Sequence, residues 1–213
     1  MLAIDPPHDC PLCPRLAAFR DENRAKFPDW FNGPVPNWGD REPKLIIVGL
    51  APGLKGANRT GRPFTGDYAG DLLYRTLLKF GLATGEYAAD PHDTLQLRGV
   101  MIGNGVRCVP PQNKPTGSEI VTCRSFFKAT LSANAGVLGY LVLGRIAHDQ
   151  LLSTLGERRG SFPFAHGAEH RLSNGARLFD SYHCSRYNTN TGVLTEAMFE
   201  DVVGRAASLV NAA

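Results

Sequence analysis

The stretch from Leu45 to Gly70, LIIVGLAPGLKGANRTGRPFTGDYAG, decides the fold of this chain. It opens with a near-continuous apolar run, which is typical of a parallel strand that is buried on both faces. Glycine then recurs through the following loop, where the absence of side chains lets backbone N–H groups approach a ligand. These glycines are Gly49, Gly53, Gly56, Gly61 and Gly66. Because open α/β sheets place their sites at the carboxyl ends of strands, we expect a functional site in this loop.

The same loop carries side chains that suit a phosphate-linked base. Arg59 and Arg62 can pair with phosphate. Phe64 offers a flat apolar face, and Asp67 supplies one acid just before a helix. The common nucleotide-binding motifs do not match. GxGxxG is absent, and the nearest match to GxxxxGKS or GxxxxGKT has Arg62 and Pro63 in place of the Lys and the Ser or Thr. The alternative interpretation is a long surface loop in which Asp67 only caps a helix.

The length and charge of the chain limit its class. A chain of 213 residues suits one α/β domain, so we treat residues 1–213 as a single domain with an N-terminal cysteine-bearing segment. The formal net charge is +3, and 17 of the 23 cationic residues are arginine, which weakly favours a nucleic-acid partner. No stretch approaches the ~18 apolar residues of a membrane span, and the N-terminus has no basic region followed by an apolar one. We therefore expect a cytoplasmic protein with no membrane partner.

Apolar runs predict four strands, and amphipathic or capped segments between them predict helices. The strands are expected at 45–50, 99–106, 139–143 and 177–182. The helices are expected at 14–24, 67–80, from 116, at 145–155 and from 195. This alternation favours an α/β protein of three layers, α/β/α, with a central four-stranded parallel sheet. Polar residues follow three of the four strands, so one site at one edge of the sheet is predicted.

The second strand leads into a stiff polar loop. The strand carries Asn104 near its end, and the loop VPPQNKPT presents Asn113 between two prolines, followed by Lys114. A rigid loop loses less freedom on binding than a flexible one, so we interpret Asn113 as a recognition residue. The alternative is a turn that uses Asn for its backbone preference. Thr116 and Glu119 then form the pattern of a capping box for the next helix.

The fourth strand opens into the loop HCSRYNTNTG, from His183 to Gly192. An isolated histidine is usually a core residue, but His183 leads a polar loop that ends in glycine, which favours a site. The other polar residues of interest in this loop are Ser185, Arg186, Asn188, Asn190 and Thr191.

Five cysteines occur in the chain, of which four form two pairs. Cys10 and Cys13 make a CxxC, and Cys108 and Cys123 have fourteen residues between them. A disulfide framework is unexpected in the cytoplasm, so these four predict metal or cluster ligands. The second pair lacks the short spacing of a zinc ribbon, and distant thiolates are compatible with an iron–sulfur cluster, but the residues alone leave zinc open. The alternative is a set of unpaired buried thiols.

Four segments together resemble one known family: CPLC, GLAPGLKGANRTGRPFTGD, VRCVPPQNKPT and HCSRYNTNTG. From Cys10 to its last helix, the chain is similar to family five of the uracil-DNA glycosylase superfamily, the type B enzymes of bacteria and archaea. The resemblance implies a four-stranded parallel sheet between helices. It also implies a 4Fe-4S cluster as cofactor, held by Cys10, Cys13, Cys108 and Cys123.

The resemblance also implies roles for individual residues. Asp67 would be the catalytic acid, Asn113 a supporting active-site residue and His183 the hydrogen-bond donor to the base. The base would be bound by Gly49, Ala51, Phe64 and Asn104, with Phe64 stacked on the flipped base. DNA would be contacted by Arg59, Arg62, Lys114, Ser185, Arg186 and Asn188, and the loop 185–191 would enter the duplex where the base left. No family role matches Tyr68 or Cys184.

The expected function is therefore that of a DNA glycosylase in base-excision repair. It would act as a monomer on double-stranded DNA, flip uracil or another deaminated base, and hydrolyse the N-glycosidic bond. Asn104 departs from family five, which often has a small residue there, whereas family four uses an Asn to read uracil; we therefore expect a stronger preference for uracil than the family's broad range. The alternatives are a non-catalytic iron–sulfur module that binds nucleic acid and a zinc-dependent nucleic-acid binder.

Overall fold

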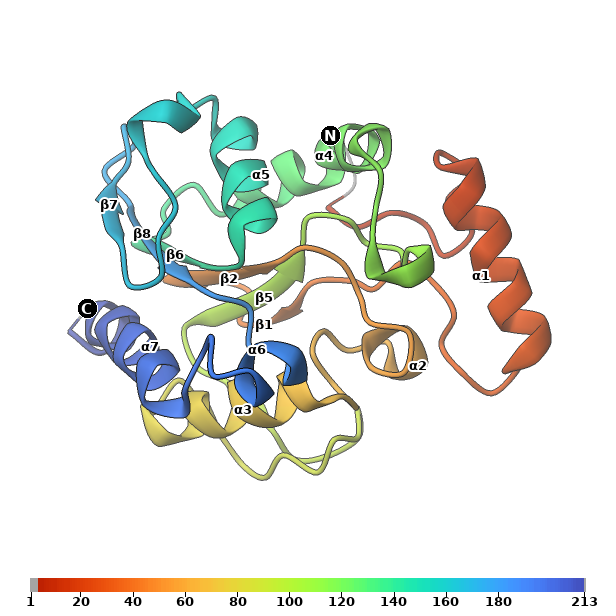
Figure 1. Cartoon of the computed structure of the whole chain (residues 1–213), viewed down its shortest axis with the longest axis horizontal. Coiled ribbons are helices and arrows are strands. Elements are labelled where there is room, and N and C mark those ends of the chain that lie inside the picture. The colour runs from red at the N-terminus through yellow and green to blue at the C-terminus, as the bar shows by residue number, and fades with distance from the viewer. Residues whose placement is uncertain (1–3, 213) are drawn as a thin grey trace.

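A computed structural model describes residues 4–212 of the chain (Figure 1). Its strands are β1 (Trp38–Gly39), β2 (Leu45–Gly49), β3 (Ala83–Thr84), β4 (Gln96–Leu97), β5 (Val100–Asn104), β6 (Gly139–Leu143), β7 (Glu169–Arg171) and β8 (Arg177–Ser181). Its α-helices are α1 (Pro14–Lys26), α2 (Ala57–Thr60), α3 (Tyr68–Lys79), α4 (Gly117–Ala133), α5 (Arg145–Leu155), α6 (Arg186–Asn190) and α7 (Glu196–Asn211). Two short 3-10 helices are η1 (Pro111–Asn113) and η2 (Arg159–Ser161).

Six strands form the central sheet, in the order β1-β5-β2-β6-β8-β7. The four middle strands run parallel, whereas β1 and β7 pair antiparallel at the two edges. β3 and β4 form a separate two-stranded ribbon. The α/β prediction and its four parallel strands are thus confirmed, and the number of strands in the sheet is corrected from four to six. The edge strands have only two and three residues, which is too few to produce a periodic apolar pattern.

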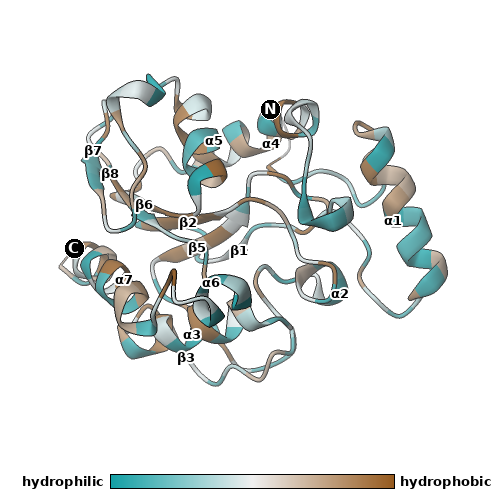
Figure 2. Cartoon of the chain, viewed as in Figure 1, coloured by the Kyte–Doolittle hydropathy of each residue, from teal (hydrophilic) through white to brown (hydrophobic). Residues whose placement is uncertain are grey.

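β2 shows how the sheet divides the hydrophobic core. Leu45 and Ile47 pack in the cluster that includes residues of α3 and α7, whereas Ile46 and Val48 pack in the cluster that includes residues of α4 and α5. Side chains alternate across a strand, so a strand with apolar residues at every position must be covered on both faces. Figure 1 shows α4 and α5 on one side of the sheet and α3 and α7 on the other. Figure 2 shows hydrophobic strands between helices that carry many hydrophilic residues.

Three helices begin at the capping residues that the sequence predicts. The side chains of Asp67, Thr116 and Thr195 each accept a hydrogen bond from a backbone N–H in the first turn of α3, α4 and α7. The capping box of Thr116 and Glu119 is confirmed, because both of its reciprocal hydrogen bonds are present. Among the helices of residues 4–212, none combines the length and the apolar character that a membrane span requires.

The parallel direction of the middle strands places their carboxyl ends at one edge. Gly49 at the end of β2 pairs in register with Asn104 at the end of β5, and Leu143 of β6 pairs with Ser181 of β8. The loops that follow these strands therefore begin side by side. This is the edge at which the sequence predicts the site.

Candidate active site

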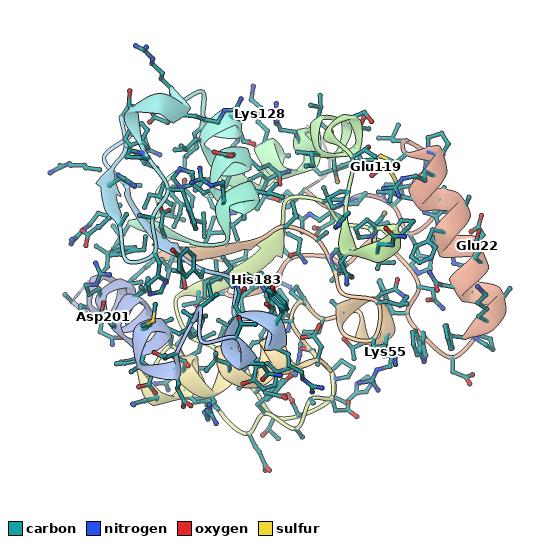
Figure 3. The ribbon with its side chains drawn as sticks, in the orientation of Figure 1. Glu22, Lys55, Glu119, Lys128, His183 and Asp201 are labelled. Carbon is teal, nitrogen blue, oxygen red and sulfur yellow. The ribbon has the colours of Figure 1, made fainter. Side chains whose placement is uncertain are left out.

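A cavity of about 620 Å³ opens at the carboxyl ends of the parallel strands. The predicted residues that line it are Ala51, Phe64, Asp67, Asn104, Asn113, His183, Ser185 and Arg186. They come from the loops after β2, β5 and β8, so the fold brings together segments that are far apart in the chain. In Figure 3, His183 lies near the centre of the molecule, and Lys55, which also lines the cavity, lies toward α2.

Asp67 is held at the start of α3 and is enclosed by the glycine-rich loop. Its Oδ1 accepts a hydrogen bond from the N–H of Gly70 at 3.3 Å. A β-carbon on Gly53 would come within 2.8 Å of Oδ2 of Asp67, and one on Gly56 would overlap it. These two glycines therefore provide the space for the carboxylate, a more specific role than the close ligand approach expected of them. The helix cap uses Oδ1, so capping does not exclude a catalytic role for Asp67.

Phe64 forms part of the cavity wall in a strained backbone conformation. Its φ of +52° lies in the left-handed region, which is unfavourable for a bulky residue and is typical of functional sites. The hydroxyl of Tyr74 donates to the carbonyl of Pro63 at 2.5 Å, and that of Tyr87 donates to the carbonyl of Phe64 at 3.4 Å. The Phe64 ring lies 6.0 Å from the His183 imidazole, measured between centroids. This geometry presents an aromatic face on which a flat base can stack.

His183 lies just after β8 and supplies a neutral imidazole. Its backbone carbonyl accepts a hydrogen bond from Nδ2 of Asn188 at 2.8 Å, which braces the loop. Burial lowers the pKa of His183 below its usual 6.5, and the carboxylate of Asp67 partly offsets this effect. The imidazole is therefore neutral at pH 7 and donates one N–H. Such a donor suits an atom on which negative charge develops.

Asn104 carries an unpaired polar atom into the site. The residue is 3% exposed, and within residues 4–212 its Oδ1 has no hydrogen-bond partner. A buried amide oxygen without a partner costs about 1–3 kcal/mol, so a ligand that satisfies it gains that free energy. Gly49 lies beside it, since a β-carbon there would overlap Oδ1 of Asn104 and come within 2.8 Å of the Phe64 ring. Gly49 does not itself line the cavity but makes room for two side chains that do.

Asn113 reaches the cavity from an exposed loop. It lines the cavity together with Asp67 and His183, and Lys114 is exposed next to it. Gln112 and Asn113 both have a φ of +56°, so two consecutive residues other than glycine occupy the left-handed region. The turn is therefore strained, whereas the rigidity that its prolines predict stays a prediction.

The rim of the cavity carries side chains that the sequence interpretation did not identify. Lys55 and Tyr68 line the cavity, and the guanidinium of Arg186 lies 5.4 Å from the centroid of the Tyr68 ring. Tyr187, the next residue on α6, is 74% exposed. Tyr187 could have been identified from the sequence, because it is an aromatic residue within a polar loop that follows a strand. No local signal marked Lys55 or Tyr68, because only the fold places them at the cavity.

Arg62 corrects one prediction, because it is not placed to contact phosphate. Its side chain is 4% exposed, and its two terminal nitrogens donate to the carboxylate of Asp93 at 2.7 and 2.8 Å. Its Nε donates to Oγ1 of Thr65 at 2.8 Å, and its guanidinium lies 4.8 Å from the centroid of the Trp38 ring. Arg62 thus ties the glycine-rich loop to a segment about 30 residues later in the chain. The spacing within the loop could not reveal this partner.

Three other residues expected to contact DNA lie outside the cavity wall: Arg59, Lys114 and Asn188. Asn188 uses its side-chain amide to brace the carbonyl of His183, so it serves the shape of the loop. Arg59 is exposed and donates through Nε to the carbonyl of Lys55 at 3.0 Å. The exposed part of Arg59 remains accessible to a phosphate outside the cavity.

The four paired cysteines line a second, small and mainly apolar cavity. Cys10, Cys13, Cys108 and Cys123 all contribute to its wall, together with side chains such as Leu16, Val106 and Phe126. All five cysteines of the chain are free thiols, and Cys184 lies elsewhere, with its Sγ 3.5 Å from the carbonyl of Ala69. Within residues 4–212, no three His, Cys, Asp or Glu side chains come close enough to hold a single metal ion. Four cysteines around one cavity are the donor set that an iron–sulfur cluster uses.

The surroundings of three of these cysteines favour the neutral thiol. Burial raises the pKa of Cys13 to about 11 and that of Cys108 to about 12, and the neighbouring Cys123 raises both further. Burial also raises the pKa of Cys123, although the backbone N–H of Arg107 donates to its Sγ at 3.4 Å and opposes this shift. These three cysteines would bind a metal or cluster as thiolates only where that group supplies positive charge.

Comparison with known proteins identifies the family. Residues 36–206 match the model of the uracil DNA glycosylase superfamily, and the chain belongs to this superfamily of hydrolytic DNA glycosylases. The chain is 45% identical over 206 residues to the type-5 uracil-DNA glycosylase of Thermus thermophilus, covering 94% of this chain and 93% of the relative. It is 37% identical over 204 residues to the type-5 enzyme of Pyrobaculum aerophilum, covering 94% and 88%. These matches place the chain in the type-5 family.

A type-4 uracil-DNA glycosylase is a more distant relative. The type-4 enzyme of Sulfurisphaera tokodaii is 27% identical over 175 residues, covering 79% of this chain and 72% of the relative. The family predicted from the four sequence segments is thus confirmed.

Proposed function

We propose that this protein excises uracil from DNA by hydrolysing the N-glycosidic bond. The observation that carries the proposal is the grouping of Phe64, Asp67, Asn104 and His183 around one cavity in a chain of this family. Breaking the bond leaves positive charge on the sugar and negative charge on the base. The Asp67 carboxylate stabilises the first and orients the water whose oxygen bonds to the sugar carbon. The neutral imidazole of His183 donates a hydrogen bond to the base as the base takes the electrons of the broken bond, and the proton that the water loses ends on the departing base.

The target base must leave the stack before it can enter the cavity. Unstacking costs a few kcal/mol and is cheapest for a mispaired base, such as uracil opposite guanine. Stacking on Phe64 returns roughly 1–3 kcal/mol. Tyr187 is the exposed side chain at the rim that we assign to the space left in the duplex, and Arg186, Lys55 and Lys114 supply positive charge for the phosphates on either side.

The amide of Asn104 supports a preference for uracil over larger deaminated bases. Uracil offers an N–H donor beside a carbonyl acceptor, which complements the unpaired Oδ1 and the amide N–H groups of Asn104. Hypoxanthine presents the same pair of groups, so hydrogen bonding alone does not separate the two bases. We therefore base the preference for uracil on the resemblance of Asn104 to the Asn with which family four reads uracil. Excision of purines is accordingly a secondary activity of this enzyme.

The four-cysteine cavity is the proposed site of a 4Fe-4S cluster. Each iron of such a cluster takes one thiolate, so the four sulfurs are spaced more widely than around one tetrahedral zinc ion. Cys10, Cys13, Cys108 and Cys123 would hold it, and the cluster would supply the positive charge that their thiolates need. Ala51 packs with these cysteines and also lines the base cavity, which supports a structural role for the cluster next to the site.

The partner is double-stranded DNA in base-excision repair, and the acting unit is one chain. The site-forming loops after β2, β5 and β8 all come from one sheet, which supports a single chain as the acting unit. The segment 185–191, which contains α6 and the exposed residues Arg186 and Tyr187, and the cations near the cavity form the surface that we assign to the duplex.

The experiment that tests the function uses a labelled duplex with one uracil opposite guanine. Wild-type protein is incubated with it, and alkali then breaks any abasic site. We expect cleavage by the wild type and a loss of at least 100-fold for Asp67→Asn, with DNA affinity retained in that variant. Equal behaviour of wild type and Asp67→Asn, with DNA binding but no cleavage, would replace the enzyme by a non-catalytic nucleic-acid-binding module. Iron and sulfide analysis of the same sample tests the cluster, and zinc without iron would overturn it.

A further inference from the structure

The loop that carries Asn113 is strained and exposed, so its conformation must be stabilised by hydrogen bonds and not by burial in the core. Gln112 and Asn113 both have a φ of +56°, and a left-handed conformation costs residues other than glycine about 1–3 kcal/mol each. Gln112, Asn113 and Lys114 are all exposed, so the core does not enclose this turn. Such a conformation persists only where neighbouring groups determine it.

Two backbone hydrogen bonds lie within the turn, from the N–H of Asn113 to the carbonyl of Pro110 and from that of Lys114 to Pro111, and a further contact comes from α1. The Nη2 of Arg15 donates to the backbone carbonyl of Lys114 at 3.1 Å, across 99 residues of sequence. The same guanidinium forks onto the carboxylate of Glu119, with Nε to Oε1 at 2.8 Å and Nη2 to Oε2 at 2.7 Å. Arg15 therefore contacts the residue directly after Asn113 while it is itself fixed by two charge-assisted hydrogen bonds.

Glu119 is fixed in turn by the start of α4. It is 6% exposed, and its Oε2 accepts a hydrogen bond from the backbone N–H of Thr116 at 2.7 Å. Its own N–H donates to Oγ1 of Thr116 at 3.3 Å. Figure 3 shows Glu119 near α1, in agreement with its contact to Arg15. The carboxylate thus connects the capped end of α4 to a side chain of α1.

We propose that Arg15 is a positioning residue for excision and acts through Asn113. Arg15, Glu119 and the Lys114 carbonyl form a clamp that holds the strained turn, so that the Asn113 amide stays at the cavity wall. The inference rests on the proposed function for the role of Asn113, and none of the three clamp residues lines the cavity. In the sequence, Arg15 is only an arginine two positions after Cys13. Its contacts to Glu119 and Lys114 arise because the fold brings α1 next to the start of α4.

A double-mutant cycle tests this inference. Single-turnover excision of uracil is measured for wild type, Arg15→Met, Asn113→Ala and the double variant. We expect Arg15→Met to slow excision about 10-fold in the wild-type background, because a misplaced active-site group costs up to about 100-fold. In the Asn113→Ala background the same change should slow excision less than about twofold, because the group that Arg15 positions is already absent. Arg15→Lys should recover part of the rate, since lysine can reach only one acceptor at a time.

Two controls separate positioning from damage to the fold. Arg24→Met removes another arginine of α1 that pairs with Asp9, and it should leave the excision rate unchanged. Glu119→Gln keeps a residue type that can complete the capping box but weakens the paired hydrogen bonds to Arg15. It should therefore also slow excision, and it serves as the test if Arg15→Met does not fold. Thermal unfolding and iron content are measured for every variant.

Three outcomes would overturn the positioning role. One is an Arg15→Met effect of equal size in both backgrounds, and another is an Asn113→Ala variant as fast as wild type. The third is a loss of iron in Arg15→Met, because the defect would then follow from the cysteine site. Inactive wild-type protein contradicts the proposed function instead, so the two failures are distinguishable.

Discussion

The carboxylate of Asp67 lies directly against the backbone of Gly56. A β-carbon at Gly56 would overlap Oδ2 of Asp67 and come within 2.7 Å of its Cγ. The glycine loop and the acid therefore form one unit: the loop leaves the space that the acid fills. The position of the proposed catalytic group depends on a residue that has no side chain.

Adding that missing β-carbon should displace the acid. We expect Gly56→Ala to slow uracil excision about 100-fold, because the carboxylate must move away from its position at the cavity. Single-turnover excision measures this effect, and thermal unfolding shows whether the fold persists. Gly136→Ala is the matched control, because a β-carbon there meets nothing within 4 Å. A Gly56→Ala enzyme as fast as wild type would show that Asp67 acts from another position.

The buried pair of Arg62 and Asp93 should contribute to stability and not to DNA affinity. Arg62→Met leaves a carboxylate that is 3% exposed without its partner, which should lower the free energy of unfolding by about 3–5 kcal/mol. Denaturant unfolding measures this loss. Arg59→Met, at the exposed arginine of the same loop, should leave stability unchanged and reduce the salt dependence of DNA binding by about one phosphate contact. A stability loss in Arg59→Met together with a weaker salt dependence of DNA binding in Arg62→Met would contradict this division of roles.

The same pair predicts how stability responds to acid. The hydrogen bonds from Arg62 hold the pKa of Asp93 at about 2, below its usual 3.8. A carboxyl group whose pKa is lower in the folded state stabilises the fold above the unfolded value and loses this contribution as the pH falls through the folded value. The contribution should therefore be complete above pH 3.8 and disappear toward pH 2. Unfolding curves of wild type and Asp93→Asn should converge in that range; a constant difference down to pH 2 would exclude the pair as its source.

His183 should titrate below the usual pH for histidine. Its pKa is lowered by burial and partly restored by Asp67, so Asp67→Asn should lower it further. Stability linked to His183 should be complete above pH 6.5 and fall as the pH decreases, since the unfolded chain binds this proton more readily. NMR of the imidazole resonances in both proteins measures the two pKa values. Titration of His183 at or above pH 6.5 in the wild type would contradict the neutral donor.

Asn104→Ala should change the choice of base. Removal of the amide takes away the group that we assign to the recognition of uracil, so the ratio of uracil to hypoxanthine excision should fall at least about tenfold. Both rates are measured on duplexes that differ only in the target base. Asn113→Ala should slow both bases alike and serves as the control. Equal rates for the two bases in the wild type would remove the proposed preference.

Local sequence patterns predicted the main strands and several helix starts. The all-apolar run at Leu45–Val48 predicts a strand covered on both faces, and both core clusters contain residues of that run. Capping residues such as Thr116 mark helix starts because their hydrogen bonds reach only three residues along the chain. The edge strand β1 was missed, because its two residues owe their structure to pairing with β5 and not to a pattern of their own.

Sequence by itself determined the four parallel strands, three of the helix caps, the family and the edge of the sheet at which the cavity lies. Tertiary structure alone decided that Arg62 is enclosed by Asp93 and Trp38, that Gly53 and Gly56 accommodate Asp67, and that Arg15 reaches the turn beside Asn113. The reason is physical. Periodicity and capping depend on neighbours within a few residues, whereas the burial of a charge or the space for a β-carbon depends on segments that only packing brings together.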